Sequence, residues 1–397
     1  MDGRLLFKDC TLLHADGRLE PGMALCAVGR HISAVGDDAD FPLLPGDWAV
    51  DCGGRALAPG LIDCHTALPV EPHLLDLATL ERLAAHALAE GLLRGVTTRV
   101  LQLPGPDPLP RLEAVSRAAS LVGARTLLTV APGEADGPDA ALAQLSAVSD
   151  LAQRLADHPQ QRAVSGWRGR APRDPDFHAQ VHAALIATGG AAVLDRTDPR
   201  SPVAREGLED PGTGDWLGLQ ALLVGSPGLE AEARGQRAAE DALRVVGPGH
   251  AAGGEEGGVD GLPMGLSAGV LESGLSRVAW RLLARARRIG LPESRVAQVV
   301  GDALVGAPAA WMSRRFDVSM GKLEPGAAAD LVLYDWVPQT RGRQASALLG
   351  DRMDARVWWT VVDGRVVVRE GALLGPDGGG LARAAAVAQA RLAGAAA

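Results

Sequence analysis

The stretch APGLIDCHTALPV, from Ala58 to Val70, decides how the rest of this chain is interpreted. A Pro-Gly turn leads into a short apolar run, which predicts a strand, and this strand ends in polar residues. Two imidazoles at positions i and i+2 of a strand point to the same side, so a His-x-His pair at a strand end can hold one metal ion. Here the first position is His65 and the second is Ala67. The stretch therefore raises the question of whether a metal site is present, reduced or absent.

The middle of the chain alternates short β-rich runs with segments rich in Ala, Leu and Arg. In these segments apolar residues recur at three- and four-residue spacing, which is typical of amphipathic helices. Repeated strand–helix units imply parallel strands covered by helices, in a sheet that is either open or closed into a barrel. The predicted helices cover 77–95, 111–124, 174–190 and 230–243, and the predicted strands 96–103, 125–132, 191–196 and 244–249.

Both ends of the chain are β-rich instead. The first fifty residues consist of short β-rich runs separated by tight turns, and the same texture returns at 326–336 and 355–371. In the last of these segments Asp363-Gly364 predicts the tip of a hairpin. The simplest arrangement packs the two ends together as one small β-sandwich that is discontinuous in sequence.

Composition and charge exclude several classes of function. The formal net charge of -9 argues against binding to nucleic acid or to an anionic membrane surface. No apolar run approaches the roughly 18 residues that a membrane span needs, and the first ten residues do not predict a signal peptide. The four cysteines form no C-x-x-C pair, which favours free thiols over disulfides. We therefore expect a cytoplasmic protein.

Four segments, in this order along the chain, resemble the amidohydrolase superfamily. ALAPGLIDCHTAL (56–68) resembles the family's first-strand motif P-G-h-I-D-x-H-x-H, and LLRGVTTRV (92–100) its second-strand segment. MGKLEPGAAADLVLYDW (320–336) and VWWTVVDGRVVVREG (357–371) resemble the return into the β-sandwich and its last hairpin. The C-terminal part is most similar to the aminohydrolase and chlorohydrolase branch. The resemblance covers residues 1–100 and 300–375, and between them it rests on element order alone.

This resemblance implies a (β/α)8 TIM-like barrel with a small β-sandwich built from both chain ends. The implied divisions are 1–57 and 319–375 for the two parts of the sandwich, 58–318 for the barrel, and 376–397 for a C-terminal helix or tail. It also implies one or two divalent metals at the carboxyl ends of the barrel strands. Such a metal activates a water for attack on a C–N or C–Cl bond.

Most of the ligand positions that the resemblance implies are occupied by other residues. His65 matches the first histidine of the motif, and Asp260 falls where the closing aspartate is expected. A catalytic zinc normally keeps three protein ligands, so two residues leave an ion bound mostly by water. At the positions where the family has its His-containing ligand motifs, this sequence instead has Ala67, Trp167, Arg168, Leu194 and Asp195.

Two functions from different classes remain. The first is a non-catalytic pseudo-amidohydrolase without a cofactor. It would serve as a structural or assembly subunit, in a homo-oligomer or in a complex with an active paralogue or another enzyme subunit. The alternative is a hydrolase of non-peptide C–N bonds, with one Zn or Fe ion held by His65 and Asp260 and with Asp260 as a catalytic residue. Arg168, in the Arg-rich stretch WRGRAPRD, either binds an anionic group or belongs to a solvated loop.

Three further motifs have simpler interpretations. His178 and His182 lie four residues apart on one helical face, but they lack the Glu of H-E-x-x-H, so a metal site is not favoured. GLSAG, at 265–269, has the letters of a nucleophile elbow in what we expect to be a Gly-rich loop entering a helix, which favours chance. Trp358 and Trp359 are adjacent on a strand and must face opposite sides, which hints at an interface for one of them.

Overall fold

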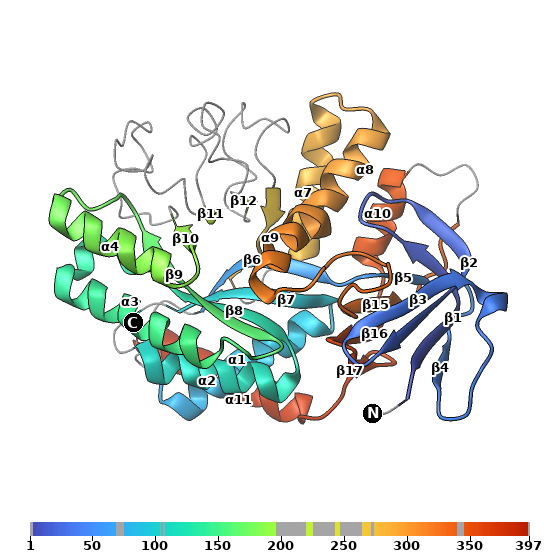
Figure 1. Cartoon of the computed structure of the whole chain (residues 1–397), viewed down its shortest axis with the longest axis horizontal. Coiled ribbons are helices and arrows are strands. Elements are labelled where there is room, and N and C mark those ends of the chain that lie inside the picture. The colour runs from blue at the N-terminus through green and yellow to red at the C-terminus, as the bar shows by residue number, and fades with distance from the viewer. Residues whose placement is uncertain are drawn as a thin grey trace.

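The chain folds around two β-sheets, one parallel and curled, the other mixed (Figure 1). The computed structural model describes residues 3–68, 75–103, 105, 108–195, 220–224, 243–246, 264–270, 274–339 and 345–395. No helix in these ranges is long and apolar enough to span a membrane.

The curled sheet consists of parallel strands in the order β13-β12-β11-β10-β9-β8-β7-β6-β14. The two strands at its opposite edges, β13 and β14, follow one another in the chain with only two residues between them. The chain itself therefore brings the two edges of this sheet together. The strands are β6 (Leu61–Ala67), β7 (Val96–Gln102), β8 (Arg125–Val130), β9 (Gln161–Arg168), β10 (Ala191–Asp195), β11 (Gln220–Val224), β12 (Leu243–Val246), β13 (Met264–Leu266) and β14 (Gly269–Val270).

Helices cover the outside of the curled sheet, and local sequence signals set their ends. The side chains of Asp76 and Asp174 accept hydrogen bonds from the main-chain N–H groups of Thr79 and Phe177, so each caps the first turn of a helix. The helices are α1 (Leu77–Leu92), α2 (Pro108–Val122), α3 (Pro138–Arg154), α4 (Pro175–Ala187), α7 (Leu275–Arg288), α8 (Glu293–Gly301), η6 (Asp302–Gly306), α9 (Ala307–Phe316), α10 (Ala345–Asp354) and α11 (Gly378–Ala395), with short 3-10 turns η1 (Asp38–Asp40) and η3 (Glu134–Asp136).

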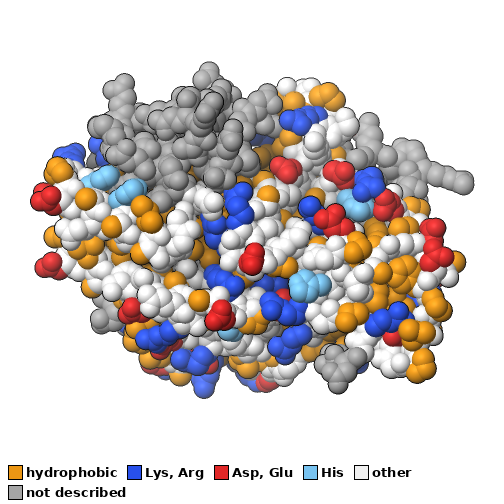
Figure 2. All heavy atoms as spheres, viewed as in Figure 1, with side chains coloured by type: hydrophobic (Ala, Val, Ile, Leu, Met, Phe, Trp, Pro, Cys, Tyr) orange, Lys and Arg blue, Asp and Glu red, His pale blue; other side chains and the backbone are white. Residues whose placement is uncertain are grey.

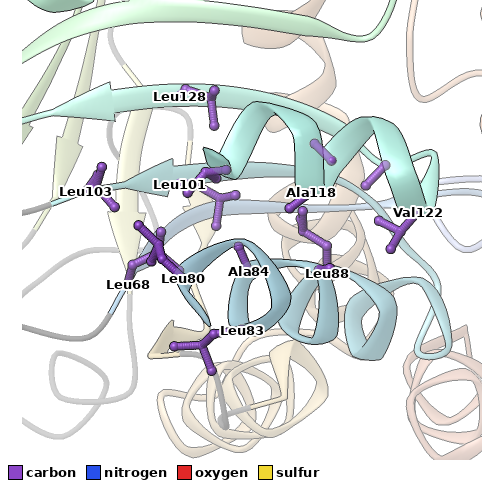
Figure 3. Close-up of a cluster of buried hydrophobic side chains, with 14 of the residues drawn as sticks. Leu68, Leu80, Leu83, Ala84, Leu88, Leu101, Leu103, Ala118, Val122 and Leu128 are labelled. Atoms are coloured by element: carbon purple, nitrogen blue, oxygen red, sulfur yellow. The ribbon is translucent and has the colours of Figure 1, made fainter. Parts of the chain in front are cut away.

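Buried side chains divide between the two faces of the curled sheet. Figure 3 shows Leu80, Leu83 and Leu88 of α1 packed with residues of α2, β7 and β8 on the outer face. A second cluster joins residues from seven strands, β6 to β12, and such residues can meet only if they face the inside of the curl. Trp311 and Phe316 of α9 belong to the same inner cluster. The inside of the sheet is therefore a packed core.

The mixed sheet is built from both ends of the chain, in the order β18-β17-β16-β15-β5-β1-β2-β3, with β4 paired to β1. Its hairpin tip is Asp363-Gly364, and both residues have positive φ, 55° and 75°, as a two-residue hairpin turn requires. The strands are β1 (Leu5–Leu13), β2 (Leu19–Val28), β3 (His31–Asp37), β4 (Trp48–Asp51), β5 (Ala56–Pro59), β15 (Leu331–Tyr334), β16 (Val357–Val362), β17 (Arg365–Arg369) and β18 (Ala372–Leu373).

The predicted α/β class is confirmed, with a parallel curled sheet and a mixed sheet drawn from both chain ends. The four cysteines are free and buried, as predicted. The predicted helix over 230–243 falls almost wholly outside the described residues. The segment 265–269 was predicted as a loop entering a helix. The helix α7 does follow it, but β13 and β14 occupy the ends of the segment itself. The residue at which each domain begins or ends stays a prediction.

A buried cluster of charges joins the two sheets. Arg125, at the start of β8, is fully buried, and its Nε and Nη2 donate to both carboxylate oxygens of Asp330 at 2.9 and 3.2 Å. Nη2 also donates to Asp363 at the hairpin tip at 2.9 Å, and Nη1 to the carbonyl of Pro159 at 2.9 Å. Burial lowers the pKa of the Arg125 guanidinium, but the two carboxylates outweigh it, so the net shift is upward. One guanidinium thus fixes the mixed sheet to the curled sheet.

We predict that Arg125→Met lowers the free energy of unfolding by about 3–5 kcal/mol, because two buried carboxylates lose their cation. Arg117→Met removes an exposed pair with Glu81 and should cost less than about 1 kcal/mol. Equilibrium unfolding in urea measures both. Equal losses in the two variants would show that the buried cluster does not join the sheets.

Candidate functional site

A β-bulge in β6 turns His65 toward the inside of the curled sheet. Asp63 pairs with Arg99 of β7, and Thr66 pairs with Leu101, so β6 advances three residues where β7 advances two. The extra residue changes which side chains share a face, and a bulge commonly re-aims a side chain in this way. As a result, the imidazole of His65 reaches Gln102, the last residue of β7. Local sequence pattern alone does not show this.

Three buried polar residues form a hydrogen-bonded chain at the carboxyl ends of the strands. His65 Nε2 lies 2.9 Å from Gln102 Oε1, and Gln102 Nε2 donates to Asp195 Oδ2 at 2.8 Å. The three side chains come from β6, β7 and β10 and are 4%, 6% and 4% exposed. The amide of Gln102 therefore links a histidine and an aspartate that lie far apart in the sequence.

The order of donors and acceptors in this chain fixes the state of the imidazole. An ionised carboxylate only accepts hydrogen bonds, so the NH2 group of Gln102 faces Asp195 and its carbonyl oxygen faces His65. The Nε2 atom of His65 must then carry a hydrogen and donate it. The Nε2 atom in that state has no lone pair to offer a metal ion, so Nδ1 is the ring atom of His65 that could still bind one.

The carboxylate of Asp63 in β6 binds the segment between β13 and β14. Its Oδ1 accepts from the main-chain N–H groups of His65 at 3.3 Å and of Ala268 at 3.0 Å, and its Oδ2 accepts from Thr66 Oγ1 at 2.7 Å. Arg99 Nε lies 3.2 Å from Oδ2. Burial lowers the pKa of the Arg99 guanidinium, and Asp63 opposes that shift. Asp63 is fully buried, and its partners come from its own strand and from distant segments of the chain.

The chain was compared with known proteins by sequence. No family model matches it. It is 30% identical over 194 residues to an adenine deaminase of Rubrobacter xylanophilus, a match that covers 46% of this chain and 30% of that protein. An imidazolonepropionase of Xanthomonas euvesicatoria is 48% identical over 61 residues, which are 15% of each chain. The matched segments thus span less than a third of these relatives.

Solved structures match over nearly the whole length. An adenosine deaminase from Xanthomonas campestris with bound zinc has a TM-score of 0.76 at 17% identity, covering 98% of each chain. An atrazine chlorohydrolase from Arthrobacter aurescens complexed with zinc has a TM-score of 0.71 at 17% identity, covering 96% of this chain and 99% of that one. The fold is that of the amidohydrolase superfamily. The predicted resemblance, including its closeness to the chlorohydrolase branch, is confirmed.

Solved structures with the amidohydrolase fold include zinc-bound examples, but the residues described here do not fit such an ion. His65 Nε2 donates a hydrogen bond to Gln102, and the side chain of Ala67 has no atom that can coordinate a metal. Burial, and then the charge of Asp63, raise the pKa of the neighbouring Cys64 thiol well above its ordinary value. Within the described ranges, no three His, Cys, Asp or Glu side chains lie close enough to hold one ion.

Arg168 lies on the strand next to Asp195, and its side chain has another partner. Arg168 ends β9 and pairs with Asp136 at 3.3 Å, where its side chain is 31% exposed. Asp260 lies outside the described residues. The structure therefore leaves the roles of His65, Arg168 and Asp260 as predictions.

Three motifs take structural roles. His178 and His182 stack with their ring centroids 6.4 Å apart, and Figure 2 shows two imidazoles side by side on one face. Ser267, in GLSAG, is buried, and its hydroxyl donates to the carbonyl of His65. Trp359 is buried, while Trp358 is covered in part by Arg55, whose guanidinium lies 5.5 Å from its ring centroid.

Sequence reasoning missed Gln102, the residue on which this site depends. Gln102 is the last polar residue of the predicted strand VTTRVLQL, and a loop follows this strand. Polar residues at the carboxyl ends of parallel strands gather at one edge of a sheet, so its position was the available signal.

We predict that Gln102→Met lowers the free energy of unfolding by about 1–3 kcal/mol, since His65 and Asp195 each lose a buried partner. Gln180→Met, on the exposed face of α4, should change it by less than about 0.5 kcal/mol. Denaturant unfolding gives both values. In 15N-labelled protein, the Nε2–H resonance of His65 should exchange slowly in the wild type and rapidly in Gln102→Met. An Nε2 without a bound proton in the wild type would contradict the assigned hydrogen-bond chain.

Proposed function

We propose that this chain is a non-catalytic amidohydrolase-superfamily protein. In this proposal its parallel sheet is a closed (β/α)8 barrel, and a hydrogen-bonded chain of neutral and acidic side chains stands where active relatives carry a metal. The adjacency of β13 and β14 in the chain, with β13 on β12 and β14 on β6, supports closure. Gly265 supports it too, because a Cβ there would lie 2.4 Å from Cys64 Sγ, so only glycine lets the closing segment approach β6 this closely.

The observation that carries this proposal is the position of Gln102. Its amide uses the Nε2–H of His65 and an oxygen of Asp195, the two strand-end groups best suited to bind a metal. A metal ligand must direct a lone pair at the ion, and a catalytic site must also leave room for water. A neutral amide between the two groups serves neither purpose.

The role that fits such a protein is that of a structural or assembly subunit. We infer a homo-oligomer, or a cytoplasmic complex with an active paralogue or another enzyme subunit. The support is that the scaffold is intact while the site is altered. The buried joint around Arg125, the packed inner core and the Asp63 contacts are all present.

A second candidate is a hydrolase of non-peptide C–N bonds with a reduced site for one Zn or Fe ion. Its support is the sequence match to an adenine deaminase and an imidazolonepropionase. In that case His65 would have to release Gln102 and bind the ion together with Asp260, which would also act as the catalytic carboxylate.

We predict that the purified wild-type protein keeps less than about 0.1 mole of Zn, Fe or Mn per chain after dialysis, because its strand ends offer too few lone pairs. Elemental analysis by mass spectrometry measures this. Incubation with adenine and with a chlorotriazine should give no turnover above the no-enzyme control. Near-stoichiometric metal with measurable deamination would establish the second candidate instead.

We predict that Ala67→His alone does not create a zinc site, because Gln102 still holds His65 Nε2 in its protonated form. The double variant Ala67→His/Gln102→Leu frees that nitrogen and should bind zinc about 10–100-fold more tightly than Ala67→His. Isothermal titration with zinc compares the two variants, and Gln102→Leu alone is the matched control. Tight zinc binding by Ala67→His alone would show that Gln102 does not block the site.

A further inference from the structure

A cavity of about 460 Å³ lies at the opposite end of the curled sheet from His65. Its lining includes Leu61, the first residue of β6, and Arg94, which precedes β7, so it lies at the amino ends of the strands. The helices α7 and α10, which pack on one another, form a second wall (Figure 1). Tyr334 and Val357 of the mixed sheet form a third. The cavity is therefore built where both sheets meet the helices between them.

Its charge is unlike that of the whole protein. Four arginines line the cavity, Arg94, Arg277, Arg352 and Arg356, and none of its described lining residues is an aspartate or a glutamate. The chain as a whole carries a formal net charge of -9. Arg94 pairs with Glu90 at 2.8 Å, while the structure gives Arg277 no acidic partner among the described residues. The cavity is thus a local concentration of positive charge in an acidic protein.

Arg352 adds a second, independent observation. It is 2% exposed, its Nε donates to Tyr334 Oη at 3.2 Å, and its Nη2 donates to the carbonyl of Pro59 at 3.0 Å. Its Nη1 is buried and has no hydrogen-bond partner within the part of the chain that the structure describes. Buried guanidinium groups are normally paired with an anion, because desolvation of an unpaired charge is costly. No carboxylate of the described chain fills that role here.

The first turn of α7 faces the same space. Gly274 caps this 14-residue helix without a side-chain hydrogen bond. The N–H of Arg277 donates to the Gly274 carbonyl at 3.0 Å, while those of Leu275 and Ser276 have no acceptor within the helix. Ser276 and Arg277 of that turn line the cavity. A helix N-terminus favours anions, and here it adds to the arginines around it.

The size and the apolar part of the lining define the class of ligand. The volume is within the range of pockets for small organic molecules and exceeds that needed by a free phosphate ion. Leu93, Leu304 and Val357 supply an apolar surface beside the arginines. The guanidinium group is well suited to the oxygens of a phosphate, which it can bind in a bidentate manner.

We propose that this cavity binds an organic phosphate monoester. The phosphate lies among Arg277, Arg352 and Arg356 at the start of α7, and the organic part lies against the leucines. The ligand contacts both sheets at once. This site is separate from the strand-end residues His65, Gln102 and Asp195. A test of ligand binding in the cavity is therefore independent of a test of the proposed function.

Isothermal titration at low and constant ionic strength tests the proposal with three probes: phenyl phosphate, benzoate and phenol. We predict that phenyl phosphate binds most tightly, benzoate more weakly, and phenol not measurably. In Arg277→Ala/Arg356→Ala the affinity for phenyl phosphate should fall about tenfold or more, because two charge-assisted contacts are lost. Arg288→Ala, which removes an exposed arginine at the far end of α7, is the matched control and should bind as the wild type does.

Both variants replace exposed side chains, so they should fold, and circular dichroism checks this. Phenyl phosphate that fails to bind the wild type would overturn the proposal. So would equal binding of phenol, or an unchanged affinity in the double variant. Benzoate that binds more tightly than phenyl phosphate would overturn the assignment to a phosphate.

Discussion

The carboxylate of Asp63 is the contact on which both the sheet and its site depend. Main-chain N–H groups of β6 and of the closing segment donate to the same buried oxygen, so the two edges of the sheet cannot separate without leaving a carboxylate unpaired. The same residue accepts from Thr66 within the bulge. The bulge in turn brings His65 to Gln102. The same carboxylate therefore joins β6 to the segment between β13 and β14 and supports the bulge that orients the imidazole.

The hydrogen-bond chain from His65 to Asp195 shows how polar groups at the strand ends of this fold can be paired by side chains. Strand-end polar groups that face a core must be paired, and a metal ion is one way to pair them. An amide with one donor side and one acceptor side is another, provided that its neighbours are an imidazole N–H and a carboxylate. Gln102 meets this condition. In this way Gln102 gives a hydrogen-bond partner to His65 Nε2 and to one carboxylate oxygen of Asp195.

Local patterns predicted the elements but not the contacts between them. The strand after Gly60, the helix from Leu77 and the hairpin tip at Asp363 follow from periodicity and turn chemistry within a few residues. Gln102 could not be assigned a role, because its partners depend on a bulge in one strand and on a strand 93 residues away. The buried Arg125 was missed for the same reason, since its carboxylates lie more than 200 residues later. The helices α3 and α8 to α10 were not predicted.

The two ends of the curled sheet differ in chemistry, and this bears on where the protein acts. At the carboxyl ends of the strands, His65, Gln102 and Asp195 pair with one another, and the carboxylate of Asp195 makes this group acidic. At the amino ends, arginines from three separate segments line a cavity. Both sheets contribute to its walls, and the Arg125 cluster holds these sheets together. That joint requires both ends of the chain, since Asp330 and Asp363 come from the C-terminal part and their sheet includes β1 to β5. The composite architecture thus has a consequence that does not depend on the strand-end residues, because it forms the arginine-lined cavity.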